Sequence, residues 1–121
     1  MEETTFYNNR GKPVAYTQDE TYIYLFSGKP VGYFDQDSIF SFSGKHLGRY
    51  NNGWVRDNSG KCVFFTVNAS GSGPAKPAKS AKPAKGAKSA KPAKGAKQAR
   101  PARPANSLSW SSLSFEWFFN Q

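Results

Sequence analysis

The dipeptide Gly-Lys recurs at a nearly constant interval through the first half of the chain. Its glycines are separated by 17, 16 and 16 residues, and they are Gly11, Gly28, Gly44 and Gly60. A period of this length indicates that one supersecondary unit is repeated and that the copies bury their apolar faces against one another. The first half of the chain is therefore predicted to be four copies of one unit.

Apolar residues stand at fixed distances from each glycine. Ser-Gly or Arg-Gly forms the centre of each unit, and glycine adopts positive φ there without steric cost. In a hairpin closed by such a turn, the residues five before and three after the glycine face each other. We therefore predict an all-β fold of four consecutive β-hairpins with approximate fourfold symmetry. Its core would consist of Phe6, Ile23, Ile39 and Val55 together with Val14, Val31, Leu47 and Val63.

Three segments of different composition define the predicted domain organisation. Residues 1–70 form the four-hairpin head, which carries equal numbers of basic and acidic side chains. Residues 71–105 are a low-complexity basic linker, and residues 106–121 are an aromatic C-terminal segment. The linker holds no acidic residue, so the net charge of +9 belongs mainly to it.

The linker consists of triplets with alanine in the middle and a cation at the end. A polyproline II helix has three residues per turn and would line such cations along one edge, about 9 Å apart, whereas proline breaks an α-helix. A flexible linker has the same composition, so both interpretations remain open. In either case we expect the cationic stretch to lie outside the packed part. The candidate polyanion-binding residues are Lys76, Lys79, Lys82, Lys85, Lys88, Lys91, Lys94, Lys97, Arg100 and Arg103.

The C-terminal segment places Leu113, Phe115, Trp117 and Phe119 at a period of two residues. This period is typical of a β-strand. The middle hairpins are apolar on both faces, as in residues 22–26, and their second face needs a cover. We therefore predict that residues 106–121 return to the head as one or two strands.

The lysines that follow the turn glycines are a further candidate site. In a fourfold arrangement they would form a ring near the hairpin tips that could hold an anion, although lysine is also a common solvated residue beside a turn. The Ser-Gly-Lys turns lack the remaining residues and the helix of a phosphate loop, which excludes nucleotide binding by that route. The ring consists of Lys12, Lys29, Lys45 and Lys61.

The chain has one histidine and one cysteine, His46 and Cys62, at equivalent places in neighbouring repeats. A dyad of these residues would need an Asn or Asp to orient the imidazole, and their column contains none. Asp35 and Asp37 begin like a calcium loop but lack its later ligands. We predict no catalytic residue, no metal site and no cofactor.

Three stretches resemble the bacterial 4-fold β-flower proteins. These are residues 53–65, the proline-containing cation triplets, and the closing residues 110–119, so the resemblance covers nearly the whole chain. It implies four β-hairpins with approximate fourfold symmetry and brings no biochemical activity with it.

Two functions from different classes remain open. The first is a non-catalytic β module that binds a protein partner or self-associates. The second is non-specific binding of nucleic acid or another polyanion through the linker cations, with a steep dependence on salt. No apolar run approaches the ~20 residues needed to span a bilayer, and Met1-Glu2-Glu3 is acidic where an export signal is basic. We therefore expect a cytoplasmic protein with no membrane contact.

Overall fold

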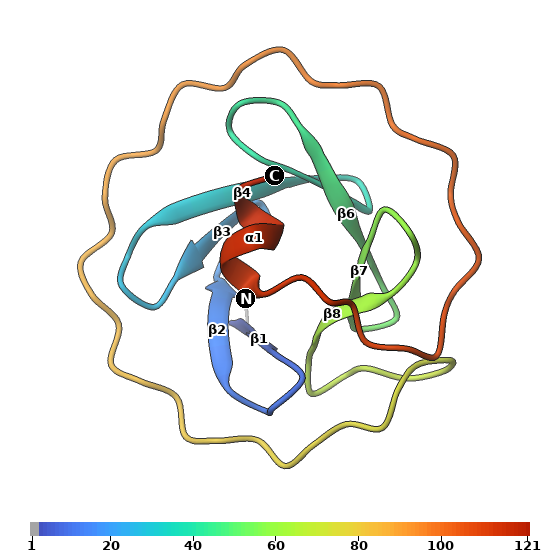
Figure 1. Cartoon of the computed structure of the whole chain (residues 1–121). Helices are drawn as coiled ribbons and strands as arrows, with labels where there is room; N and C mark the ends of the chain where they lie inside the picture. The colour runs from blue at the N-terminus through green and yellow to red at the C-terminus, as the bar shows by residue number, and fades with distance from the viewer. Residues whose placement is uncertain (1–2) are drawn as a thin grey trace.

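Four β-hairpins close into a barrel in the computed structural model, which describes residues 3–121 (Figure 1). Every strand pairs antiparallel with its chain neighbours, and β1 closes the barrel by pairing with β8 through Tyr7 and Phe65. The prediction of four consecutive hairpins is confirmed. The strands are β1 (Thr4–Tyr7), β2 (Pro13–Thr17), β3 (Tyr22–Leu25), β4 (Pro30–Asp35), β5 (Ser38–Phe40), β6 (His46–Asn51), β7 (Trp54–Asp57) and β8 (Cys62–Phe65).

The four hairpin tips point outward at quarter turns around the barrel axis (Figure 1). Each tip contains one of the repeated glycines, and all four have positive φ, between 77° and 99°. The register of each hairpin shifts at the same place, directly after its inward-facing residue Phe6, Ile23, Ile39 or Val55. A bulge of this kind bends and twists a strand, which suits the closure of so small a barrel.

The two apolar columns fill the barrel interior. All eight of their residues are buried in one cluster, which also contains Phe118 and Phe119 from the C-terminus. Outside the barrel, aromatic residues form three separate clusters between the hairpins. These outer clusters explain why the middle repeats are apolar on both faces. Their buried aromatic members are Tyr7, Trp54 and Phe65; Tyr16, Tyr24 and Phe26; and Tyr33, Phe40 and Phe42.

The C-terminal segment returns to the head, but it is not a strand. It makes one parallel bridge between Trp110 and Cys62 and then forms a short helix, α1 (Phe115–Phe119). Ser114 caps this helix by accepting a hydrogen bond from the amide of Trp117. The helical turn directs Phe118 and Phe119 into the end of the barrel and leaves Trp117 outside. The prediction of one or two returning strands was wrong, because N-capping by Ser114 and burial of the adjacent residues Phe118 and Phe119 favour the helix.

Residues 74–107 run as an extended chain around the perimeter of the head (Figure 1). We call this segment the belt. It contains no helix or strand, and most of its side chains are exposed. The belt nevertheless contacts the backbone of all four hairpin tips. The prediction placed the cationic stretch outside the packed part of the molecule and did not include these contacts.

Candidate functional site

The belt is joined to the tips by a repeating set of backbone hydrogen bonds. The carbonyl oxygen of each turn glycine accepts a bond from a belt amide, and successive amides lie nine residues apart. Three triplets of the belt therefore correspond to one hairpin. The bonds are Ser80 to Gly11 at 2.9 Å, Ser89 to Gly28 at 2.9 Å, Gln98 to Gly44 at 2.7 Å and Ser107 to Gly60 at 3.1 Å.

Two further belt amides bond to the tips of the middle hairpins. Gly86 donates to the carbonyl of Phe26 and Gly95 to that of Phe42, both at 2.7 Å. A Cβ atom at either glycine would lie 2.4 Å from the carbonyl oxygen of Ser27 or Ser43. Only glycine therefore allows the belt to approach these two tips so closely.

The first residues of the triplets record this hydrogen-bonding register in the sequence. Every first residue that donates to a tip is Ser, Gly or Gln, namely Ser80, Gly86, Ser89, Gly95, Gln98 and Ser107. The remaining first residues are prolines, which have no amide hydrogen: Pro74, Pro77, Pro83, Pro92, Pro101 and Pro104. The distribution of proline in the belt thus matches the positions where no donor is needed.

Several belt lysines lie over tyrosine rings of the head. Lys88 Nζ is 4.8 Å from the ring centre of Tyr24, and Lys94 Nζ is 4.4 Å from that of Tyr33. Both ammonium groups also approach a second tyrosine. Cation–π contacts of this length contribute about 0.5–1 kcal/mol each at exposed sites. The lysine side chains therefore hold the belt against the outer aromatic clusters.

Other belt cations pair with acidic residues near the turns between hairpins. Lys85 Nζ lies 2.7 Å from Glu3, and Lys97 Nζ lies 2.6 Å from Asp35. Arg100 also pairs with Asp35, and Arg103 with Asp37. The hydrogen bond and charge of Lys97 lower the pKa of the Asp35 carboxyl. Part of the belt's positive charge is therefore compensated within the molecule.

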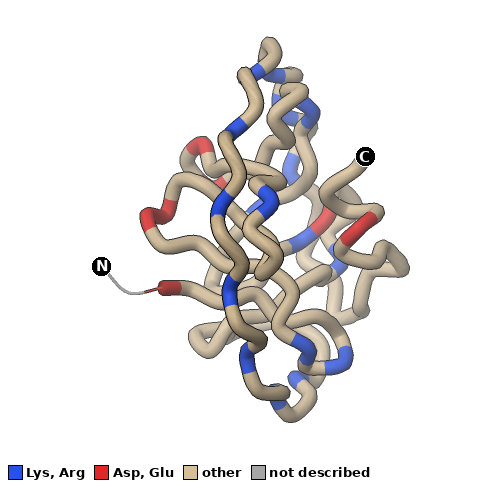
Figure 2. Tube along the Cα trace, turned by 90° about the vertical axis from the view of Figure 1, so that its left-hand side faces the viewer, with Lys and Arg blue, Asp and Glu red and all other residues tan. Residues whose placement is uncertain are grey.

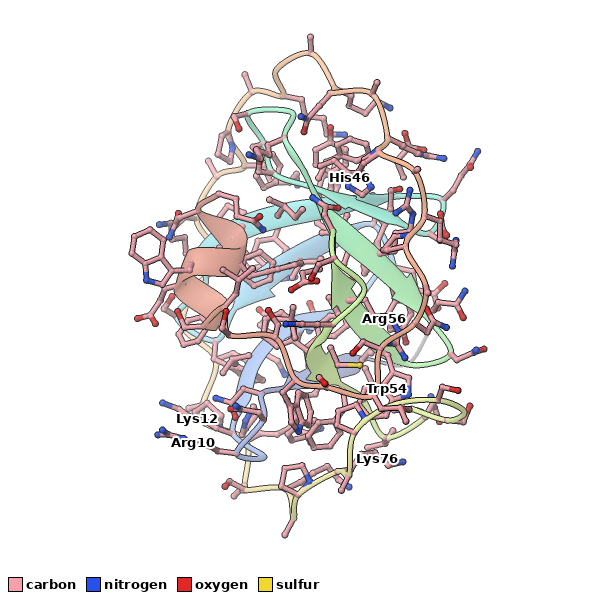
Figure 3. All side chains as sticks on the ribbon, turned by 45° about the vertical axis from the view of Figure 1, so that its right-hand side comes forward. Arg10, Lys12, His46, Trp54, Arg56 and Lys76 are labelled. Carbon is pink, nitrogen blue, oxygen red and sulfur yellow. The ribbon has the colours of Figure 1, made fainter. Side chains whose placement is uncertain are left out.

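The turn lysines lie at the four tips and are exposed. Because the tips point away from one another, the four lysine positions are spread around the perimeter of the head (Figure 1). Arg10 and Lys12 both project outward at the first tip (Figure 3). These residues contribute to a basic perimeter, which is too wide for one small anion to contact all four lysines.

His46 and Cys62 are both completely buried. The His46 ring donates from Nδ1 to Asn58 Oδ1 at 2.7 Å and accepts at Nε2 from the Ser38 hydroxyl at 2.9 Å. Burial lowers the pKa of His46, so the ring is neutral near pH 7. Burial also raises the pKa of the Cys62 thiol, which keeps it protonated. The sequence prediction missed Asn58 because it lies in the turn of the next hairpin, outside the column of His46.

Arg56 on β7 is a buried cation that the sequence prediction missed. Its guanidinium donates to the carbonyl oxygens of Gly60 at 2.8 Å and Ser107 at 2.7 Å, and also to that of Ser72. Ser72 precedes the belt and Ser107 ends it, so Arg56 joins both ends of the belt to the head (Figure 3). The signal available in the sequence was a cation directly after Val55, one of the predicted core residues.

A hollow of about 380 Å³ opens beside the C-terminal segment at the helix end of the barrel. Leu113 and Phe115 line it, together with Arg10 from the first hairpin tip and Glu116 from α1. The remaining wall is rich in hydroxyl and amide groups. The next residue of α1 after Glu116 is Trp117, whose side chain is 70% exposed. We call this hollow and Trp117 the α1 face.

Within residues 3–121, no helix is long and apolar enough to cross a membrane. The same residues contain no group of three or more His, Cys, Asp or Glu side chains suited to bind a metal ion.

A closed barrel of four outward-pointing hairpins, encircled by its own belt, defines a small all-β module with pseudo-fourfold symmetry. Comparison with protein families matches residues 4–119 to the family described as 4-fold beta flower protein. The chain belongs to this family, as the resemblance in the sequence had indicated. Comparisons with curated proteins and with solved structures found no match.

Proposed function

We propose that this protein is a non-catalytic β module that self-associates through its α1 face. The observation that carries the proposal is the position of Trp117. It is 70% exposed on a helix whose next two residues, Phe118 and Phe119, are 0% and 6% exposed. The barrel therefore holds the helix firmly while an indole projects into solvent. Tryptophan is among the residue types that contribute most to protein–protein binding.

The α1 face is suited to binding a second copy of itself. In a two-fold dimer the same surface is used twice, so each Trp117 would lie against the hollow of the other chain. Arg10 and Glu116 both line that hollow and carry opposite charges. In such a dimer we expect Arg10 of each chain to pair with Glu116 of the other. This charge complementarity favours a second copy over an unrelated partner.

The two groups considered for catalysis support a structural role. Both ring nitrogens of His46 have hydrogen-bond partners, and the Cys62 thiol has a raised pKa, the reverse of what an attacking thiolate needs. A cytoplasmic location is part of the proposal, since a buried free thiol is compatible with a reducing compartment.

The test is sedimentation velocity of the full chain across a wide range of concentration. We expect a monomer–dimer equilibrium that Trp117→Ser weakens by about 30-fold, since loss of a central interface residue costs about 2 kcal/mol. Val67→Ser is the matched control, because Val67 is 66% exposed but lies after β8, outside the α1 face. A chain that stays monomeric at every concentration, or a loss of dimer in both variants, would contradict self-association.

A second candidate is non-specific binding of a polyanion to the perimeter. Five belt cations contact carbonyl, amide or aromatic groups and make no ion pair with a carboxylate among the described residues: Lys76, Lys79, Lys88, Lys91 and Lys94. The exposed turn lysines lie close by, since the belt is bonded to the tips that carry them. This arrangement favours charge-driven binding without base recognition.

Heparin and duplex DNA are the probes for this candidate. Retention should fall steeply with salt, and Gln substitution of Lys12, Lys29, Lys45 and Lys61 should reduce the salt slope without loosening the belt. Weak retention at about 0.15 M salt, equal for wild type and variant, would exclude the polyanion function.

A further inference from the structure

We propose that the open end of the barrel, opposite α1, binds a small organic cation of the methylated-ammonium class. This end contains a hollow of about 250 Å³, which we call the mouth. Its volume lies just below the range of about 300–1,000 Å³ typical of sites for drug-sized ligands. The occupant should therefore be a small molecule or a single side chain.

Three aromatic rings line the mouth: Phe6, Phe34 and Tyr50. They come from β1, β4 and β6, three different hairpins, and Phe34 and Tyr50 remain partly exposed. Their ring centres lie 5.7 to 6.4 Å apart, and their planes are inclined to one another by 42° to 86°. Rings inclined in this way present their faces and edges around a shared space. Aromatic enclosures of this kind bind quaternary ammonium ions through the negative potential of the ring faces.

The rim of the mouth adds negative charge and polar groups. Glu20 and Gln36 line the hollow, and Thr4 and Thr17 complete its wall. Tube segments carrying Asp and Glu at the turns between hairpins lie at the end of the molecule where the N-terminus lies (Figure 2). Several of these acids pair with belt cations, whereas Glu20 makes no ion pair within the described residues. The Glu20 carboxylate beside an aromatic floor therefore complements a cation whose charge is surrounded by methyl groups.

The mouth also departs from the fourfold symmetry of the barrel. The equivalent position in the four repeats is occupied by Thr17, Phe34, Tyr50 and Thr66. Two of these four equivalent positions hold an aromatic side chain and two hold threonine, so the hollow is left on one side of the barrel end only. Thr66 does not contribute, because it is buried and donates its hydroxyl hydrogen to the carbonyl of Gly53. Aromatic side chains at all four positions would have filled the mouth.

The test is NMR titration of the full chain, with the aromatic side-chain signals of Phe34 and Tyr50 as reporters. The probes are choline and its uncharged isostere, in which a tert-butyl group replaces the trimethylammonium group. We expect saturable shifts with choline and binding of the isostere that is about 3- to 30-fold weaker. Equal binding of the two probes, or shifts confined to the α1 face, would overturn the proposal.

Four variants locate the site. Phe34→Leu should weaken choline binding by about 3-fold or more, whereas Phe34→Tyr keeps an aromatic face and should preserve it. Glu20→Gln should weaken binding by about 2- to 5-fold, and Glu20→Asp should retain most of it. Glu20 is exposed, so its variants test the mouth even if Phe34→Leu folds poorly. Unchanged binding in both Glu20→Gln and folded Phe34→Leu would overturn the proposal.

The source of the cation is distinguished by a second probe, a peptide that carries trimethyllysine. Tighter binding of the peptide than of choline would assign the site to a modified protein side chain. Binding of choline as tight as that of the peptide would assign it to a free small molecule. The outcome is independent of self-association, since the mouth and the α1 face lie at opposite ends of the barrel.

Discussion

Nη1 of Arg56 donates a hydrogen bond to the carbonyl oxygen of Ser107 at a distance of 2.7 Å. This bond joins a strand in the wall of the barrel to the last residue of the belt. The second guanidinium nitrogen donates to Ser72, just before the belt begins. One buried side chain therefore joins both ends of the belt to the barrel. Its removal should reduce stability more than the loss of any single exposed belt cation.

Arg56→Gln should lower the free energy of unfolding by about 3 kcal/mol, because it leaves several carbonyl groups without their charged donor. Urea unfolding measures the effect. Arg49→Gln is the matched control: Arg49 also donates to a belt carbonyl, that of Pro101 at 2.6 Å, but it is partly exposed. Its loss should cost less than about 1 kcal/mol. Equal costs in the two variants would contradict the role assigned to Arg56.

Ser89→Pro tests whether the belt register stabilises the fold. Proline removes the amide that donates to Gly28, and the expected loss is about 1 kcal/mol, or about 4 °C in Tm. Ser89→Ala is the control, since it removes the hydroxyl but keeps the amide. Thermal unfolding followed by circular dichroism would compare the two. The register would be irrelevant to stability if both variants melted at the same temperature as wild type.

The pH dependence of stability should show the contribution of His46. Burial lowers the pKa of this residue in the folded chain, so below about pH 6.5 the unfolded chain binds the proton more readily. Unfolding free energy should therefore fall as pH decreases through this range, by at most about 1.4 kcal/mol per pH unit. Urea titrations between neutral pH and about pH 5 measure the slope. His46→Gln should be less stable at neutral pH and should lack the slope. A wild-type slope of zero would contradict the prediction.

The belt should resist trypsin although five of its ten cations, Lys79, Lys85, Lys88, Lys94 and Lys97, precede a residue other than proline and so offer cleavable bonds. Most of its lysines and arginines lie over aromatic rings or pair with acidic residues, and its backbone is bonded to the tips. We expect slower cleavage of the folded chain than of a synthetic peptide of residues 74–105. Once cleaved, residues 106–121 should stay with the head, since Phe118 and Phe119 are buried in the barrel. Cleavage at the rate of the free peptide would show that the belt is not bound in solution.

The repeat of Gly11, Gly28, Gly44 and Gly60 was sufficient to predict the hairpins and the core, because both depend on short-range turn chemistry and on a period. The helix α1 could not be predicted from the alternation of Leu113 to Phe119. Its formation depends on the shape of the barrel end, into which two adjacent phenylalanines must both fit. Tertiary packing overrides local pattern in segments this short.

The candidate sites show the same limits. The cations of the belt were found from composition, but their tyrosine and acidic partners are far away in sequence. The belt register was nevertheless readable, since Ser80, Gly86, Ser89, Gly95 and Gln98 interrupt the prolines in step with the hairpins. The mouth was hidden because Phe34 and Tyr50 look like ordinary strand residues. Only closure of the barrel brings them to Phe6.

Because nine belt residues correspond to one hairpin, the length of the belt is set by the number of hairpins in the barrel. A relative that gained a fifth hairpin would have one tip without a belt donor unless its belt grew by three triplets at the same time. Loss of a single residue would put every later donor out of step with its carbonyl. The number of hairpins and the number of belt triplets should therefore change together in evolution, in a ratio of one to three.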